Sequence, residues 1–120
     1  MSTFAEIIER VDRNKPNAFE KLEKLRWLTE LEGKIAAEVM LMSPAGVRNL
    51  PREKAALLCE PLVSFPYEDI YDRWLEAKID YHNGEFGAYQ NAMEAYNAAY
   101  NGFVNWFLNT YDPVQGYGGG

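Results

Sequence analysis

The chain has 120 residues, a net charge of −6, 48% hydrophobic residues and 25% charged residues. This length suits a single domain with one modest core, and the composition is that of a globular chain rather than a disordered one. The start is charged and amphipathic, unlike a signal peptide, and no apolar run is long enough to span a bilayer. We therefore expect one domain, residues 1–120, that is cytoplasmic and has no membrane partner.

The first predicted helix covers residues 3–13. Thr3 and Glu6 have the spacing of a capping box, in which each residue satisfies a backbone N–H of the first turn. One face of this helix is apolar and consists of Phe4, Ile7, Ile8 and Val11. Pro16 follows and disfavours helical backbone in the residue before it, which ends the segment.

A long amphipathic helix is predicted over residues 18–42, with Asn17 as its N-cap. Apolar residues recur at helical spacing from Phe19 to Met42. Gly33 lies inside this pattern, costs about 1 kcal/mol relative to Ala, and is consistent with the close approach of another helix. We expect the charged residues to occupy solvated faces: Lys21, Glu23, Lys24, Glu30, Glu32, Lys34 and Glu38.

Residues 44–66 contain four prolines, which exclude a long helix there. We expect an irregular, proline-rich connector. The stretch "PREKAALL" is compatible with a short helix that begins at Pro51, and "LLCEPLVSFP" with an extended, half-buried connection. An excursion of two strands is a further alternative.

Two more helices are predicted over residues 66–82 and 86–111. Pro66 suits a first helical position, and the carboxylates that follow it complement the helix dipole. Gly84 predicts the stop between the two helices. The glycine-rich tail, residues 112–120, is expected to be disordered. The predicted fold is therefore an all-α bundle of about four helices.

The last predicted helix carries two stripes of side chains. Tyr89, Met93, Tyr96, Tyr100, Phe103 and Phe107 recur at alternating steps of four and three residues, which predicts a core face and not a binding platform. Asn97, Asn101, Asn105 and Asn109 repeat every fourth residue. Asparagine is a mediocre helix former. This second stripe is either a solvated face or a neutral, hydrogen-bonding contact with another helix or subunit, where charges are depleted.

No motif for catalysis or cofactor binding is present. His82 is the sole histidine and Cys59 the sole cysteine, so no multi-histidine or CxxC metal site exists. A Cys59–His82 nucleophile–base pair lacks any local signature. Glu68, Asp69 and Asp72 cluster, but the dipole of their helix explains them. We expect no enzyme activity and no catalytic, cofactor-binding or metal-binding residues.

The charge is unevenly distributed along the chain. Residues 1–60 hold ten Lys/Arg and ten Asp/Glu, whereas residues 61–120 hold two Lys/Arg and eight Asp/Glu. Affinity for nucleic acids comes mainly from cations that neutralise phosphates. We therefore expect no tight nucleic-acid binding by the isolated chain.

The segments "KPNAFEKLEKLRWLTELEGKIAAEV", "PYEDIY" and "IDYHNGEFGAYQNAM" resemble small phage and prophage proteins of the head–tail connector (adaptor) family. The resemblance covers about residues 10–111. It implies an all-α structural subunit that forms a ring between the portal and the tail, around the exiting DNA. It also implies portal and tail proteins as partners, and a location in the virion when the phage is functional. The alternative is a small helical regulatory or DNA-packaging accessory protein that acts as a dimer.

Overall fold

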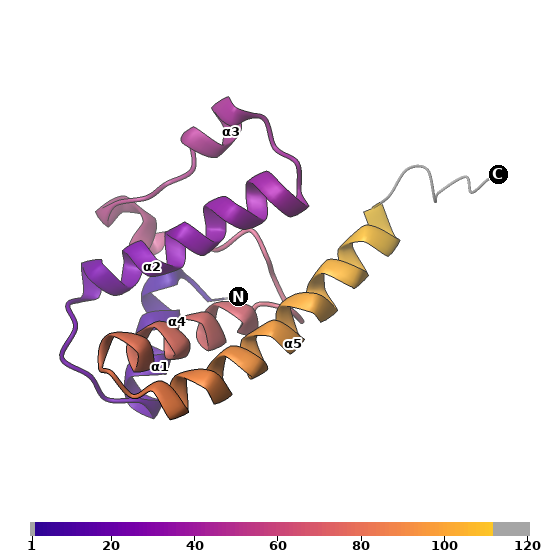
Figure 1. The fold of residues 1–120 in the computed structure, drawn as a ribbon. Helices are drawn as coiled ribbons and strands as arrows, with labels where there is room; N and C mark the ends of the chain where they lie inside the picture. The colour runs from indigo at the N-terminus through magenta and orange to yellow at the C-terminus, as the bar shows by residue number, and fades with distance from the viewer. Residues whose placement is uncertain (1, 112–120) are drawn as a thin grey trace.

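The computed structural model describes residues 2–111 and confirms an all-α bundle (Figure 1). The predicted tail, residues 112–120, lies outside the described residues. Four longer helices form the body: α1 (Phe4–Asn14), α2 (Lys21–Lys34), α4 (Asp69–His82) and α5 (Phe86–Tyr111). Shorter elements are the π turn η1 (Ile35–Val39), α3 (Pro44–Arg48) and the 3₁₀ helix η2 (Lys54–Leu58). The described residues contain no strand, so the two-stranded alternative is wrong.

Helix α1 begins with the predicted capping box. The Thr3 hydroxyl accepts from the Glu6 N–H at 3.2 Å, and the Glu6 carboxylate accepts from the Thr3 N–H at 2.8 Å. The predicted apolar face of α1 is fully buried. Two ion pairs then bind the helix and its C-terminal extension to α4. Arg10 makes two bonds to Asp72, at 2.6 and 2.8 Å, and Lys15 contacts Asp80 at 3.0 Å.

Helix α2 is shorter than the predicted range 18–42. Asn17 is not its N-cap, because the Asn17 side chain accepts from the Phe19 N–H at 3.1 Å in a local turn. The N-cap is Glu20, which forms no side-chain capping bond. At the other end, the Met40 N–H bonds to the Ile35 carbonyl at 3.0 Å, a spacing of five residues that widens the helix into a π turn.

The connector between residues 44 and 66 is irregular, as predicted, and is anchored at a few points. The short helix in "PREKAALL" exists, but it is a 3₁₀ helix that begins at Lys54 and not at Pro51. Ala56 and Val63 are buried and fix the connector to the core. Helix α4 begins at Asp69, after a turn in which the Tyr67 N–H bonds to the Ser64 carbonyl at 2.9 Å, so Pro66 is not its first residue.

Helix α4 is central, because it packs against α1, α2 and α5. Helix α5 runs antiparallel to α4 and packs mainly along it, and its C-terminal part extends beyond the body (Figure 1). Gly84 permits the tight turn between them with a φ of 74°, which confirms the predicted stop. None of the described helices has the length and apolar character that crossing a membrane requires.

The aromatic stripe of α5 faces the core. Phe103 and Tyr96 are buried, as is Leu28 of α2, while Tyr100 and Trp74 are half-buried and pack against this cluster. The Trp74 indole N–H also donates to the Trp27 carbonyl at 2.8 Å, which joins α4 to α2. The prediction of a core face is confirmed for Tyr96 and Phe103, whereas Met93, Tyr100 and Phe107 are half-buried against the core and Tyr89 lies outside it.

Two charged residues of α2 contradict the prediction of solvated faces. Lys24 is 3% exposed and Glu32 is 5% exposed. The Lys24 ammonium donates to both carboxylate oxygens of Asp12 at 2.8 Å and to the Asn17 side chain at 3.1 Å, so its charge is neutralised where it is buried. The close approach of another helix expected at Gly33 is also absent from the described structure, because a Cβ atom there would meet nothing within 4 Å.

Substituting Phe103 tests whether the stripe is core. Phe103 is 1% exposed, so Phe103→Ala leaves a cavity and should lower the free energy of unfolding by about 3–5 kcal/mol. Gln90→Ala, at an exposed position of the same helix, is the matched control and should change it little. Urea denaturation measures both. Equal stabilities for the two variants would contradict the packing of α5 described above.

Candidate subunit interface

The side of α5 that points away from α4 is an exposed, almost uncharged surface. With 100° between successive residues, eleven positions of this helix fall on that side. All of them are exposed, and Glu94 is the sole charged residue among them. We call this surface the outer face of α5: Gly87, Gln90, Asn91, Glu94, Asn97, Ala98, Asn101, Gly102, Asn105, Leu108 and Asn109.

The four predicted interface residues lie together on this outer face. Asn97, Asn101, Asn105 and Asn109 are all exposed, so no helix of the described part of the chain covers them. A contact with another helix of the same chain therefore does not explain the stripe. The two interpretations that stay open are a solvated face and a contact with another molecule.

Small residues on the outer face are not required by packing within the chain. A Cβ atom built at Gly87 or Gly102 would meet nothing within 4 Å. Ala98 is exposed as well. Gly102 is therefore not required by close packing inside the described bundle, and the space beside these residues is open to a second molecule.

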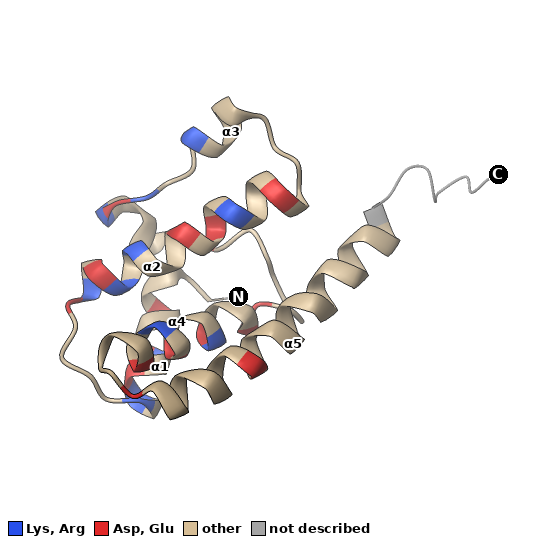
Figure 2. Ribbon diagram, viewed as in Figure 1, with Lys and Arg blue, Asp and Glu red and all other residues tan. Residues whose placement is uncertain are grey.

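The outer face also lacks cations. No Lys or Arg occurs after Lys78, and Figure 2 shows α5 with one acidic position along its described length. Removing amide and small apolar side chains from water costs far less than removing charges. This face is therefore easier to bury than a typical exposed helix face.

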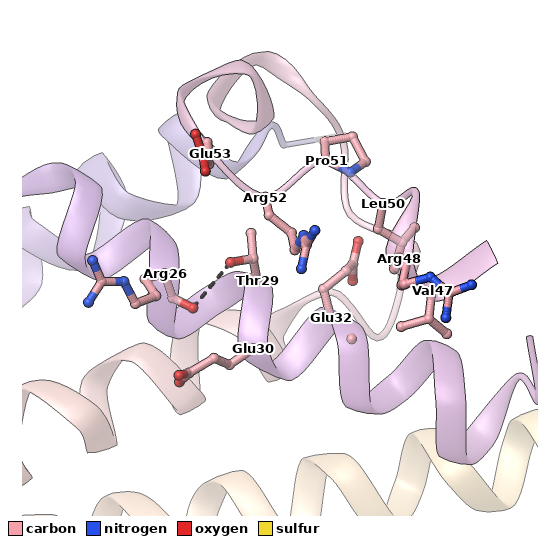
Figure 3. Close-up of a pocket in the computed structure, with 11 residues that line it drawn as sticks. Arg26, Thr29, Glu30, Glu32, Val47, Arg48, Leu50, Pro51, Arg52 and Glu53 are labelled. Carbon is pink, nitrogen blue, oxygen red and sulfur yellow. Dashed lines mark hydrogen bonds between the residues drawn. The ribbon is translucent and has the colours of Figure 1, made fainter. Parts of the chain in front are cut away.

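A second surface of different character lies on the other side of the molecule. Residues 47–54, which we call the arginine arm, run beside α2 and enclose with it a pocket of about 530 Å³ (Figure 3). Arg26, Arg48 and Arg52 line this pocket, and Lys54 lies at the end of the arm. In the described part of the chain these three arginine side chains make no ion pair or hydrogen bond.

Carboxylates also line the pocket, but they do not neutralise the arginines. In Figure 3, Arg52 points into the pocket above Thr29, whereas Glu30 points away from it. Glu53 lies on the arm itself and forms no ion pair. The third carboxylate is that of Glu32, whose oxygens already bind other groups.

Glu32 forms a buried network at the base of the pocket. Its Oε1 accepts from the Tyr71 hydroxyl at 2.5 Å, and its Oε2 accepts from the Leu62 N–H at 2.8 Å. The Tyr71 hydroxyl in turn accepts from the Val63 N–H at 3.1 Å. Burial raises the pKa of Glu32, against the effect of these two donors, and burial beside Glu32 also raises the pKa of Tyr71. The network ties the connector to α2 and α4.

Sequence reasoning missed this network because it sorted residues by charge. A usable signal was present, since Glu32 lies four residues after Leu28 and seven after Leu25, in phase with the apolar face of α2. A carboxylate in phase with an apolar stripe indicates a buried, hydrogen-bonded group. The arginine pocket had no comparable signal, because its two walls come from separate segments.

The structure brings together none of the groups considered for catalysis. His82 stacks on Trp27 with ring centroids 4.6 Å apart, whereas the Cys59 thiol donates to the Ala55 carbonyl at 3.5 Å. Asp72 is paired with Arg10, and Asp69 is paired within its own helix. Within residues 2–111, no group of three His, Cys, Asp or Glu side chains is placed to hold a metal ion.

Comparisons of the chain with protein families, with characterised proteins and with solved structures give no match. The candidate site therefore consists of two surfaces, the outer face of α5 and the arginine arm with its pocket. Both surfaces present hydrogen-bonding side chains, and neither brings together the reactive groups considered above.

Replacing Glu32 tests the network. Glu32→Ala leaves the Leu62 N–H and the Tyr71 hydroxyl without an acceptor, which should cost about 1–3 kcal/mol for each unsatisfied group. Glu32→Gln is the near-isosteric comparison, because it keeps one acceptor oxygen and removes the buried charge. Urea denaturation at neutral pH should rank the alanine variant well below the glutamine variant.

The difference in stability between the parent and Glu32→Gln should depend on pH, because the pKa of Glu32 is raised. A raised pKa in the folded state means that the native protein takes up the proton first. The stability of the parent relative to Glu32→Gln should therefore increase as the pH falls through the raised pKa, and level off below the ordinary value of 4.5. Urea titrations of both proteins across this range measure the difference. A difference that does not vary with pH would contradict it.

Proposed function

We propose that the chain is a structural subunit of a phage or prophage head–tail connector. In this function it assembles with further copies into a ring between the portal and the tail, around the exiting DNA, and works as a structural component and not as an enzyme. The observation that carries the proposal is the outer face of α5, which is long, exposed and nearly free of charge. The sequence resemblance and the all-α fold support the same assignment.

The outer face has the properties of a protein–protein contact. A helix of 26 residues is about 39 Å long, so the face is a continuous surface of useful size. Solvated helix faces are better served by Glu and Lys, which have higher helix propensity than Asn. The cores of interfaces are depleted of charge, and each amide supplies both a donor and an acceptor to a partner.

The charge of the C-terminal half supports passage of DNA through such a ring. A lumen that releases DNA must offer few cations, because every cation that neutralises a phosphate adds affinity. Arg73 and Lys78 are the two cations of this half. Arg73 is paired with Asp69 at 3.3 Å, and the Lys78 ammonium lies over the Trp74 ring at 5.2 Å. Both already have partners within the chain.

The second candidate is a dimeric regulatory or packaging accessory protein. One observation favours it, since an amide-rich face is chemically complementary to itself and can form a two-fold contact. The two candidates differ in mass in solution, because a two-fold contact closes at two copies. In either case we place the chain in the cytoplasm of the bacterial host, and in the virion when it is a connector.

Assembly tests the proposal directly. Sedimentation velocity over a range of concentrations should show the parent forming a species much larger than a dimer. Asn101→Lys with Asn105→Lys adds two cations to the outer face and should abolish that species while the helical signal and the melting temperature are kept. Ala18→Lys with Ala37→Lys adds the same charge at exposed positions outside the outer face of α5 and should assemble like the parent.

Two results would count against this function. Equal assembly of the parent and the Asn101→Lys, Asn105→Lys variant would exclude the outer face as the contact. A parent that remains a monomer at its highest attainable concentration would exclude self-assembly.

DNA binding provides an independent test. The parent should bind a fluorescent duplex more weakly than ordinary non-specific binders, whose Kd is roughly 10⁻⁴–10⁻⁶ M at physiological salt. The Asn101→Lys, Asn105→Lys variant is the positive control, since two added cations should increase the affinity measured by fluorescence anisotropy. Tight binding by the parent would contradict a lumen that releases DNA.

A further inference from the structure

We infer that the arginine arm of one copy binds the outer face of α5 of the next copy, so that neighbouring subunits meet head to tail. This inference rests on the proposed function, in which α5 forms the subunit contact. It adds the identity of the opposing surface, which the sequence resemblance does not provide.

The arginine arm has hydrogen-bond donors that the chain does not use. A guanidinium carries five N–H donors, and Arg48 and Arg52 are both exposed on the arm. Neither contacts an acceptor within residues 2–111, although four other cations of that region are paired. The buried Glu32 is not available to them, because its oxygens bind Tyr71 and Leu62.

The outer face of α5 has the complementary character. It presents amide oxygens along its length and the carboxylate of Glu94, with no cation to repel a guanidinium. Glu85, just before the first residue of the helix, is also exposed and forms no ion pair with the residues that the structure describes. Arginine is enriched at interfaces because its planar fork binds carboxylate and carbonyl oxygens with little loss of order. Arm and helix are therefore complementary in hydrogen bonding, and the outer face offers one carboxylate, that of Glu94, and no opposing cation.

These two surfaces cannot meet within one chain. The arm lies beyond α2, whereas α5 lies on the other side of the body, with α4 between them (Figure 2). A second copy is the molecule that brings an arm to an α5 face. A contact between two different surfaces is heterologous, and such contacts build rings when the rotation closes and filaments when it does not. A contact of α5 with α5 would instead close a dimer.

The arm is held in place before any contact forms. Ser43 caps α3 by accepting from the Gly46 N–H at 3.1 Å, Ala56 is fully buried, and the Leu62 N–H is bound by Glu32. The pocket between the arm and α2 is open and leaves space for side chains of a neighbouring helix (Figure 3). A preformed surface loses less conformational freedom on binding.

Charge-swap substitutions on the two surfaces test this inference. Arg48→Glu with Arg52→Glu should raise the concentration at half-assembly by roughly tenfold or more, since each factor of ten needs about 1.4 kcal/mol. Asn101→Lys with Asn105→Lys should do the same. A chain with all four substitutions should recover assembly, because a glutamate arm then faces a lysine helix. Light scattering or sedimentation velocity measures each protein.

The matched control is Arg13→Glu with Lys34→Glu, which changes the net charge equally at exposed positions outside both surfaces. It should assemble like the parent. Circular dichroism and melting temperature establish that every variant is folded, which is expected because all the substituted side chains are exposed.

The outcomes separate the two proposals. If the α5 variant loses assembly and the arm variant keeps it, the arm inference is overturned and the α5 contact stands. If the variant with all four substitutions stays dissociated, the arm does not face α5. If neither variant differs from the parent, or the parent never assembles, the proposed function falls together with the inference.

Other occupants of the arm are tested with two probes, a polyglutamate peptide and a fluorescent duplex DNA. Saturable binding of either probe to the parent, lost in Arg48→Glu with Arg52→Glu while assembly is unchanged, would assign the arm to an acidic protein segment or to DNA. Either result would overturn the contact with a second copy.

Discussion

The buried carboxylate of Glu32 is the interaction on which the arrangement of the chain depends most. It lies on α2, accepts from Tyr71 of α4 and accepts from the backbone of the connector at Leu62. Helix α2 is distant in sequence from the other two segments, and one side chain joins all three inside the core. A buried carboxylate is costly unless its oxygens are hydrogen-bonded, so the alternative placements of the connector are strongly disfavoured. With the buried Ala56 and the Ser43 cap of α3, this group helps to hold the connector that carries the arginine arm.

The two sides of helix α5 contribute separately: its inner side packs against the fold and its outer side does not. The inner side packs its aromatic rings on α4 and the core, where Phe103 and Tyr96 are buried. The outer side contributes nothing to that packing, because no described helix covers it. Changes on the outer face can therefore alter contacts with other molecules without altering the fold, which is what an assembly surface requires.

Much of the fold could be predicted from the sequence, where local chemistry decides the structure. Thr3 with Glu6 marked the start of α1, and Gly84 marked the turn before α5, because caps and turns depend on a few adjacent residues. The aromatic stripe of α5 was predictable from its spacing. The phase of Glu32 with Leu25 and Leu28 indicated its burial, but its partner Tyr71 was not predictable. The burial of Lys24 was not predictable either, since it depends on Asp12, which lies elsewhere in the chain.

The two surfaces of the candidate site also differ in how far the sequence predicts them. The four asparagines of the outer face were visible as a repeat in one helix. The arginine arm was not, because prolines between residues 44 and 66 exclude a long helix without specifying the path that replaces it. That the arm and α5 lie on different sides of the body follows only from the three-dimensional structure.

The π turn at the end of α2 bears on how the chain tolerates changes in length. A turn closed between Ile35 and Met40 accommodates one residue more than an α turn does, and the chain leaves the helical conformation directly after it. Removal of one residue between these positions would restore regular α-helical bonding and leave the apolar face of α2 in phase with the core. The region Ile35–Val39, directly after α2, is therefore the place where we expect the loss of one residue to be tolerated.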